Sequence, residues 1–110
     1  MIEEIIQNYL RENAFPCYLS VPEKPSGNFC VLEKTGSGYK DGIFTATLAV
    51  QSYGSSDYAA AQLSHRVVQT MLDADTLPEI VSCTLNTDYN FPDTTRKLPR
   101  YQAVFEVVHY

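Results

Sequence analysis

The chain has 110 residues, a formal net charge of -5 at pH 7 and a sequence pI near 4.8. This length predicts one domain, residues 1–110, near the size at which a subunit gains stability by sharing surface with a partner. The acidic balance argues against specific nucleic-acid binding, because phosphate contacts need clustered Lys and Arg. No stretch approaches the roughly 20 apolar residues that cross a bilayer, so we expect no membrane partner.

The N-terminal third predicts one helix followed by two strands. Five apolar residues recur at helical spacing and place the helix end near Asn13: Ile2, Ile5, Ile6, Tyr9 and Leu10. Residues 15–21 have the composition of a short strand, and residues 28–35 that of a second one. The glycine-rich segment 36–42 indicates a flexible connection into the next strand, as in a hairpin with a long loop.

The stretch 43–72 predicts a half-buried strand followed by an amphipathic helix. Alternation places one set of apolar side chains on the same strand face: Phe44, Ala46, Leu48 and Val50. Ser55 and Ser56 can cap the N-terminus of a helix, and Asp57 suits the positive end of its dipole. The helix repeats apolar residues along one side: Ala60, Leu63, Val67, Val68 and Met71.

The C-terminal third predicts two strands separated by a long loop. Residues 80–87 alternate, with three apolar side chains on one side: Val81, Cys83 and Leu85. Residues 88–99 form the longest irregular stretch. The last strand, 101–110, is apolar on both faces, which predicts cover on both sides, within the fold or by another subunit. The order α-β-β-β-α-β-β predicts an α+β fold, a two-layer sandwich of a mostly antiparallel sheet with both helices on one face.

No constellation of residues points to catalysis, a cofactor or a metal. Gly36-x-Gly38 precedes a strand, whereas a phosphate loop opens a helix. The three cysteines form no CxxC pair, and neither His65 on the polar helix face nor His109 near the C-terminus suggests a nucleophilic pair. We therefore expect a protein that is not an enzyme. Two glutamates within the first four residues differ from the positive start of a signal peptide, so we expect a cytosolic protein where it is made.

Arg96, Lys97 and Arg100 form the only basic cluster of the sequence, and Tyr89 and Phe91 lie next to it. One interpretation is a solvated loop, since charge runs are usually exposed. The other is a contact arm, because a loop this long in a small domain is usually functional or disordered, and Tyr, Phe and Arg are favoured at interfaces. In that arm the aromatic residues anchor the partner and the charges select it. These five residues are the candidate protein-interface residues.

The pattern as a whole resembles the tail-terminator and head-tail joining (neck) proteins of long-tailed bacteriophages. The resemblance covers nearly the whole chain. Its motifs are the amphipathic opener, the proline-flanked first strand with the strand after it, the glycine-rich hairpin, the strand-turn-helix segment in the middle and the final strand after a proline-containing loop. In this sequence the motifs read IEEIIQNYLREN, FPCYLSVPEKP, NFCVLEK, ATLAVQSYGSSDYAAAQLSHRVVQTML and YQAVFEVVHY.

The resemblance implies structural work in a virion, after assembly in the bacterial cytoplasm. Subunits of this family form a ring, typically a hexamer, on the end of the tail tube, where the ring stops tail growth and offers a surface to the head connector. The implied partners are therefore further copies of the chain, the tail tube and the connector, without catalysis or a cofactor. Two alternatives stay open: another minor capsid or tail-completion subunit of the same fold, and a small ligand-binding or enzymatic α+β domain.

Overall fold

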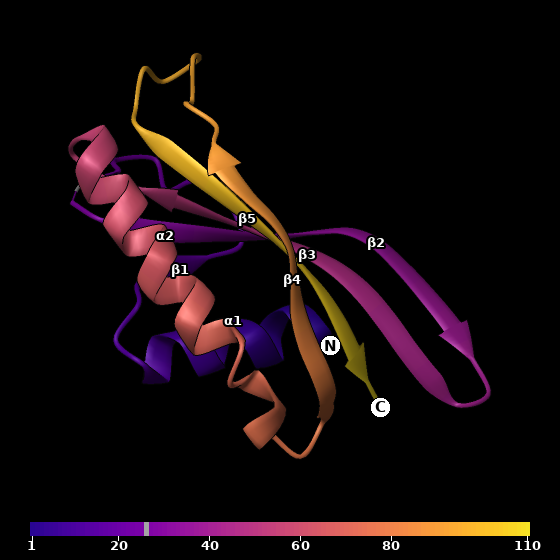
Figure 1. The fold of residues 1–110 in the computed structure, drawn as a ribbon. Helices are drawn as coiled ribbons and strands as arrows, with labels where there is room; N and C mark the ends of the chain where they lie inside the picture. Colours follow the sequence, from indigo (N-terminus) through magenta and orange to yellow (C-terminus); the bar gives the residue numbers. More distant parts are fainter. Residues whose placement is uncertain (26) are drawn as a thin grey trace.

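Two helices pack on the same side of a β-sheet in the computed structural model, which describes residues 1–25 and 27–110 (Figure 1). Helix α1 spans Ile2–Glu12, helix α2 spans Asp57–Met71, and a short 3-10 helix, η1, spans Ala74–Thr76. Side chains from both α-helices enter one hydrophobic core with the sheet. The predicted α+β fold with two layers and both helices on one face is thus confirmed.

The sheet has five strands in the order β1-β2-β3-β5-β4. Strand β3 (Ile43–Tyr53) lies in the middle and pairs antiparallel with β2 (Phe29–Lys40) and with β5 (Arg100–His109). Strand β4 (Ile80–Asn90) pairs antiparallel with the other edge of β5. Strand β1 (Cys17–Tyr18) is parallel to β2 and much shorter than the strand predicted over residues 15–21. The predicted order of elements agrees with this sheet.

The core face of β3 is largely the predicted one. Ala46, Leu48 and Val50 are at most 1% exposed, and the predicted apolar side of α2 is buried against them. Phe44 is on the same strand face but is 43% exposed. It pairs with His109, at the end of β5, and its ring packs on the rings of Tyr39 and His109. The burial of this face therefore ends before Phe44.

The connection between β2 and β3 is a two-residue turn and not a long loop. Lys40 pairs with Ile43, and the turn residues Asp41 and Gly42 have φ values of 54° and 82°. Two successive positive φ values are the signature of the type I′ hairpin turn, whose twist matches that of the strands. Gly38 lies within β2, where a Cβ would come within 2.8 Å of Thr45 Oγ1. Glycine there makes room for the cross-strand neighbour, so the segment is extended despite its glycines.

Strand β4 departs from the predicted alternation because its register shifts twice. Shifts occur between Ile80 and Ser82 and between Leu85 and Thr87. Ile80 and Cys83 are buried, whereas Val81 is 43% exposed and Leu85 is 36% exposed. The strand also continues to Asn90, three residues beyond its predicted end. β-Bulges of this kind are common on edge strands, where they oppose pairing with another chain.

The sheet face opposite the helices carries a polar ladder. On β5, Ala103, Phe105 and Val107 are buried, but the alternate residues are only half-buried. The Thr47 hydroxyl donates to the Glu106 carboxylate at 3.0 Å, and Gln51 Nε2 donates to Gln102 Oε1 at 2.9 Å. The chain itself therefore fully covers only one of the two faces for which the sequence predicted cover.

Gly54 lies at the junction of β3 and α2, where the backbone leaves no space for a side chain. The hydroxyl of the predicted cap Ser56 accepts a hydrogen bond from Ala59 N at 3.0 Å. A Cβ on Gly54 would lie 2.5 Å from Ala60 N. This backbone nitrogen cannot move away without disturbing the first turn of α2. The start of the helix therefore depends on a glycine here.

We predict that Gly54→Ala lowers the free energy of unfolding by about 1–3 kcal/mol, the usual cost of overpacking. Gly36→Ala is the matched control, because its Cβ would meet Thr47 Oγ1 at an ordinary 3.6 Å. Urea unfolding followed by circular dichroism measures both variants. Equal stability of the two would show that the strand-helix junction is less tightly packed than the structure indicates.

Leu48→Asp is expected to prevent folding, because it leaves an unpaired charge at a position that is 0% exposed in the centre of the core. Thr45→Asp places the same side chain at an exposed position of the same strand and should leave the fold intact. Far-ultraviolet circular dichroism of the two purified variants compares them. A folded Leu48→Asp protein would contradict the assigned core face.

Candidate protein interface

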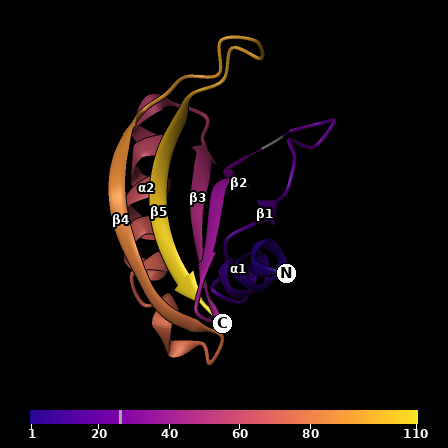
Figure 2. The same cartoon turned by 90° about the vertical axis from the view of Figure 1, so that its right-hand side faces the viewer.

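The segment that joins β4 to β5 is an ordered extension of their hairpin. Within it, Asp93 N donates to Leu98 O at 3.0 Å, and Leu98 N donates to Asp93 O at 3.1 Å. Phe91 N also donates to Arg100 O at 2.9 Å, which closes the base of the loop. Figures 1 and 2 show the segment extending beyond the end of the sheet. We call residues 91–99 the 91–99 loop.

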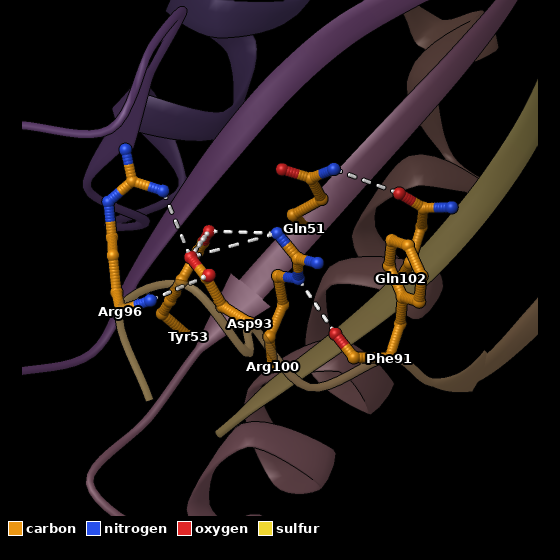
Figure 3. A network of polar contacts seen from close by, with 7 residues as sticks. All are labelled: Gln51, Tyr53, Phe91, Asp93, Arg96, Arg100 and Gln102. Atoms are coloured by element: carbon orange, nitrogen blue, oxygen red, sulfur yellow. Dashed lines mark hydrogen bonds and ion pairs between the residues drawn. The ribbon is translucent and has the colours of Figure 1, made fainter. Parts of the chain in front are cut away.

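The carboxylate of Asp93 organises this loop from a buried position. Asp93 is 4% exposed and accepts hydrogen bonds from the Tyr53 hydroxyl at 2.9 Å and from Arg96 N at 3.1 Å. Arg96 Nη1 lies 3.1 Å from the same carboxylate, and Arg100 Nη1 lies 3.9 Å from it (Figure 3). Burying a carboxylate is costly unless it is paired and hydrogen-bonded, and here it is both.

These contacts change the ionisation of Asp93 in a predictable direction. Burial by itself raises the pKa of a carboxyl group. The hydrogen bonds from the Arg96 backbone, the Tyr53 hydroxyl and the Arg96 side chain, together with the charge of Arg100, outweigh burial and hold the pKa of Asp93 below its ordinary value of 3.8. The native loop therefore favours the carboxylate over the neutral acid.

Arg100 ties the loop to the sheet. Its Nε donates to Phe91 O at 2.7 Å, and its Nη1 donates to the Tyr53 hydroxyl at 3.1 Å. The guanidinium carbon lies 4.4 Å from the centre of the Phe91 ring, a cation–π distance. The Arg100 side chain is only 14% exposed. Its charge is thus used mainly inside the subunit.

A small apolar cluster, separate from the main core, contains Tyr53 and so supports the hydrogen-bond network of Asp93. The rings of Phe29 and Tyr53 stack with centres 4.6 Å apart and an interplanar angle of 8°. Val31 completes the buried part of this cluster, and Val21 and Leu98 pack against it. Leu98 thereby links the loop to the sheet face that lacks helices. The loop is held by apolar packing as well as by charge.

The five predicted interface residues differ in how much surface they offer. Tyr89 and Phe91 are each 40% exposed, with their rings edge to face at 5.7 Å. Arg96 keeps 46% of its side chain exposed although it pairs with Asp93. Lys97 is exposed at a φ of 56° and forms no ion pair with any residue that the structure describes. Lys97 is therefore the free cation of the loop, whereas Arg100 belongs to the interior.

Sequence reasoning missed the two residues that hold the loop in place, Asp93 and Tyr53. Asp93 is the one carboxylate inside a segment with three cations, which was a local signal for an internal ion pair. Tyr53 lies 40 residues earlier in the chain, and its hydroxyl reaches Asp93 only because β3 ends beside the start of β5. Nothing in the local sequence indicates that contact.

Groups that could serve catalysis lie apart or in unreactive settings. Burial raises the pKa of the Cys17 thiol to about 11 and the pKa values of Cys30 and Cys83 to about 12, so these thiols are neutral at physiological pH. His65 is exposed on α2, on the side away from the core. Within residues 1–25 and 27–110, no group of three or more His, Cys, Asp or Glu side chains is placed to hold a metal ion.

The hollows that the described residues form include two with room for a small molecule. One, of about 540 Å³, lies along α2 and is lined by residues that include Tyr58, Gln62 and Arg66. The other, of about 530 Å³, lies between the start of α1 and the β2-β3 hairpin, where Tyr39 and Phe44 contribute aromatic rings. Ligand sites commonly fall in this size range, and they need a few convergent polar groups.

We predict that Asp93→Asn lowers the free energy of unfolding by about 2 kcal/mol near neutral pH, because charge-assisted hydrogen bonds to Arg96 and Tyr53 are weakened. The folded pKa lies below 3.8, so this stabilisation is present above that pH and disappears as the pH falls toward the folded pKa. Urea titrations from pH 7 to about pH 2.5 should therefore show the wild type losing its advantage over the variant.

Asp88→Asn is the control for that prediction, because Asp88 is an exposed residue of β4 that forms no ion pair among the described residues. It should change the free energy of unfolding by less than about 0.5 kcal/mol. If the difference between wild type and Asp93→Asn did not vary with pH, Asp93 would not be the stabilising carboxylate.

Comparison with known proteins adds no family assignment. The chain matches no protein-family model and no curated protein sequence. Neither α1 nor α2, with 11 and 15 residues, is long and apolar enough to cross a bilayer.

Proposed function

We propose that this chain is a structural subunit of a long-tailed bacteriophage, a tail-terminator or neck protein that forms a ring at the end of the tail tube. In this role it terminates tail growth and joins the tail to the head. The proposal rests on the motifs that resemble this family and on an observed α+β fold whose elements follow the order predicted from the residue patterns.

The observation that carries the proposal is the preorganised 91–99 loop. A carboxylate, two arginines and a tyrosine fix the loop from within, while Tyr89 and Phe91 remain two-fifths exposed on its flank. An interface residue that is already ordered loses less conformational entropy on binding. Exposed aromatic rings on a rigid projection are therefore suited to a protein partner.

In the proposed role the partners are further copies of the chain, as a ring that is typically a hexamer, together with the tail tube and the head connector. The protein then acts in the virion, after assembly in the cytoplasm of the bacterial host. The role requires neither catalysis nor a cofactor, and it requires no specific contact with nucleic acid or a membrane. Another minor capsid or tail-completion subunit of this fold would use the same loop with a different neighbour.

One observation favours a second candidate, a small ligand-binding or enzymatic domain. The hollow between α1 and the β2-β3 hairpin combines the aromatic rings of Tyr39 and Phe44 with the ion pair of Glu3 and Lys34, whose charged atoms are 3.8 Å apart. An aromatic wall beside a charged pair suits a small molecule with a polar end. A screen of small metabolites by thermal shift would test this candidate.

The proposed function predicts closed rings of uniform mass. Light scattering over a range of concentrations should give a discrete assembly, typically of six subunits, and electron microscopy of the same sample should show rings. Open chains of variable length, or a protein that remains monomeric and does not bind the ends of tail tubes, would contradict the proposal. Leu48→Asp, which we expect not to fold, provides the negative control for both methods.

A further inference from the structure

The corner formed by residues 72–81 is acidic and partly apolar. We call it the acidic corner. It contains Asp73, Asp75 and Glu79 and no Lys or Arg, and none of the three carboxylates forms an ion pair within the part of the chain that the structure describes. Leu72 is 45% exposed and Val81 is 43% exposed at the two ends of this segment. The surface therefore combines unpaired negative charge with apolar area.

The 91–99 loop and its base have the opposite sign and a similar composition. Residues 91–100 contain three cations and one carboxylate, a surplus of two positive charges, which falls to one if Asp57, bordering the same hollow as Lys97, is included. The exposed rings of Tyr89 and Phe91 supply the apolar area. Lys97, at the tip, has no carboxylate partner within the described part of the chain.

The two surfaces lie at opposite ends of the same strand pair. Ile80, next to the acidic corner, pairs with His109, whereas Asn90, next to the loop, pairs with Tyr101. Strand β5 therefore separates them by about 30 Å at the usual rise per residue. Figures 1 and 2 both show η1 and the loop at opposite ends of the molecule. The two surfaces cannot meet within one subunit.

We infer that the 91–99 loop of one copy of this chain docks on the acidic corner of the next copy. Lys97 then meets the carboxylates of Asp73 and Asp75, while Phe91 and Tyr89 cover the exposed side chains of Leu72 and Val81. Two different surfaces make this contact heterologous, and such a contact gives rings when its rotation closes and filaments when it does not. The inference rests on the proposed function, for which it names the contact between subunits.

A second copy is the occupant that the charges favour. The two surfaces are opposite in sign of charge and both carry exposed apolar side chains, so one sequence provides both halves. Pairing of β4 with a strand of another subunit is disfavoured, because its free edge carries two register shifts of the kind that blunt edge-to-edge association. Docking through side chains at the two ends of the strand avoids that obstacle.

A charge-reversal cycle tests this contact. Lys97→Glu and Asp75→Lys each change an exposed side chain without a hydrogen bond to the rest of the described chain. We expect each single variant to raise the dissociation constant for self-association about tenfold and the double variant to recover most of the loss. Sedimentation equilibrium at about 0.1 M salt, where the Debye length is about 10 Å, provides the measurement.

Lys40→Glu is the matched control, because it makes the same change of charge at the far end of β2, outside both surfaces. It should self-associate like the wild type, and circular dichroism should show that all variants are folded. Wild-type association should also weaken as the salt rises to about 1 M, where the Debye length is about 3 Å. No recovery in the double variant, or no wild-type self-association at millimolar concentration, would overturn the inference.

The failure of this inference can be told apart from the failure of the proposed function. Closed rings that form equally well from Lys97→Glu and from the wild type would refute the docking contact and leave the ring-forming function standing. Association that obeys the charge cycle but gives only dimers or open chains would support the contact and refute the ring. Electron microscopy of the sedimentation samples separates these outcomes.

Discussion

The pairing of β3 along both of its edges is the constraint on which the rest of the structure depends. Its partners β2 and β5 come from opposite halves of the chain, so β3 joins the two halves into one sheet. Its apolar face, with Leu48 at the centre, supports the helices, whereas its other face carries the polar ladder. The end of β3 at Tyr53 then reaches the 91–99 loop, so the same strand positions the core and the candidate interface.

Inside the loop, one buried carboxylate decides which charges are available to a partner. Asp93 engages Arg96 and Arg100, and Arg100 is also held by the Phe91 carbonyl and ring. A satisfied buried polar network fixes one arrangement of the groups around it, because any other leaves a charge unpaired. Within the described part of the chain Arg96 and Arg100 pair with Asp93, whereas Lys97 forms no ion pair, although all three cations lie within five residues.

Local signals predicted the helices well and the long-range details of the sheet poorly. Apolar spacing and the Ser56 cap predicted the ends of α1 and α2 within one or two residues. This succeeded because the hydrogen bonds and caps of a helix join residues that are close in sequence. The turn at Asp41 and Gly42 was missed because Gly36 and Gly38 imitate a loop, although cross-strand pairing holds them extended. The side on which Val81 lies was misjudged, since the register shift between Ile80 and Ser82 depends on the partner strand.

Composition was enough to select the candidate interface residues but not to rank them by exposure. Aromatic rings and cations in a long segment are a local property, whereas the division into internal and external charge depends on Tyr53, which is distant in sequence. Because Arg100 is engaged inside the subunit, Lys97 provides the exposed positive charge at one end of β5. Asp73, Asp75 and Glu79, which form no ion pair among the described residues, lie at the other end, so the two ends carry opposite charges. We propose that a subunit with opposite charges at its two ends, and with a bulged edge on β4 that resists strand pairing, makes contacts that repeat head to tail.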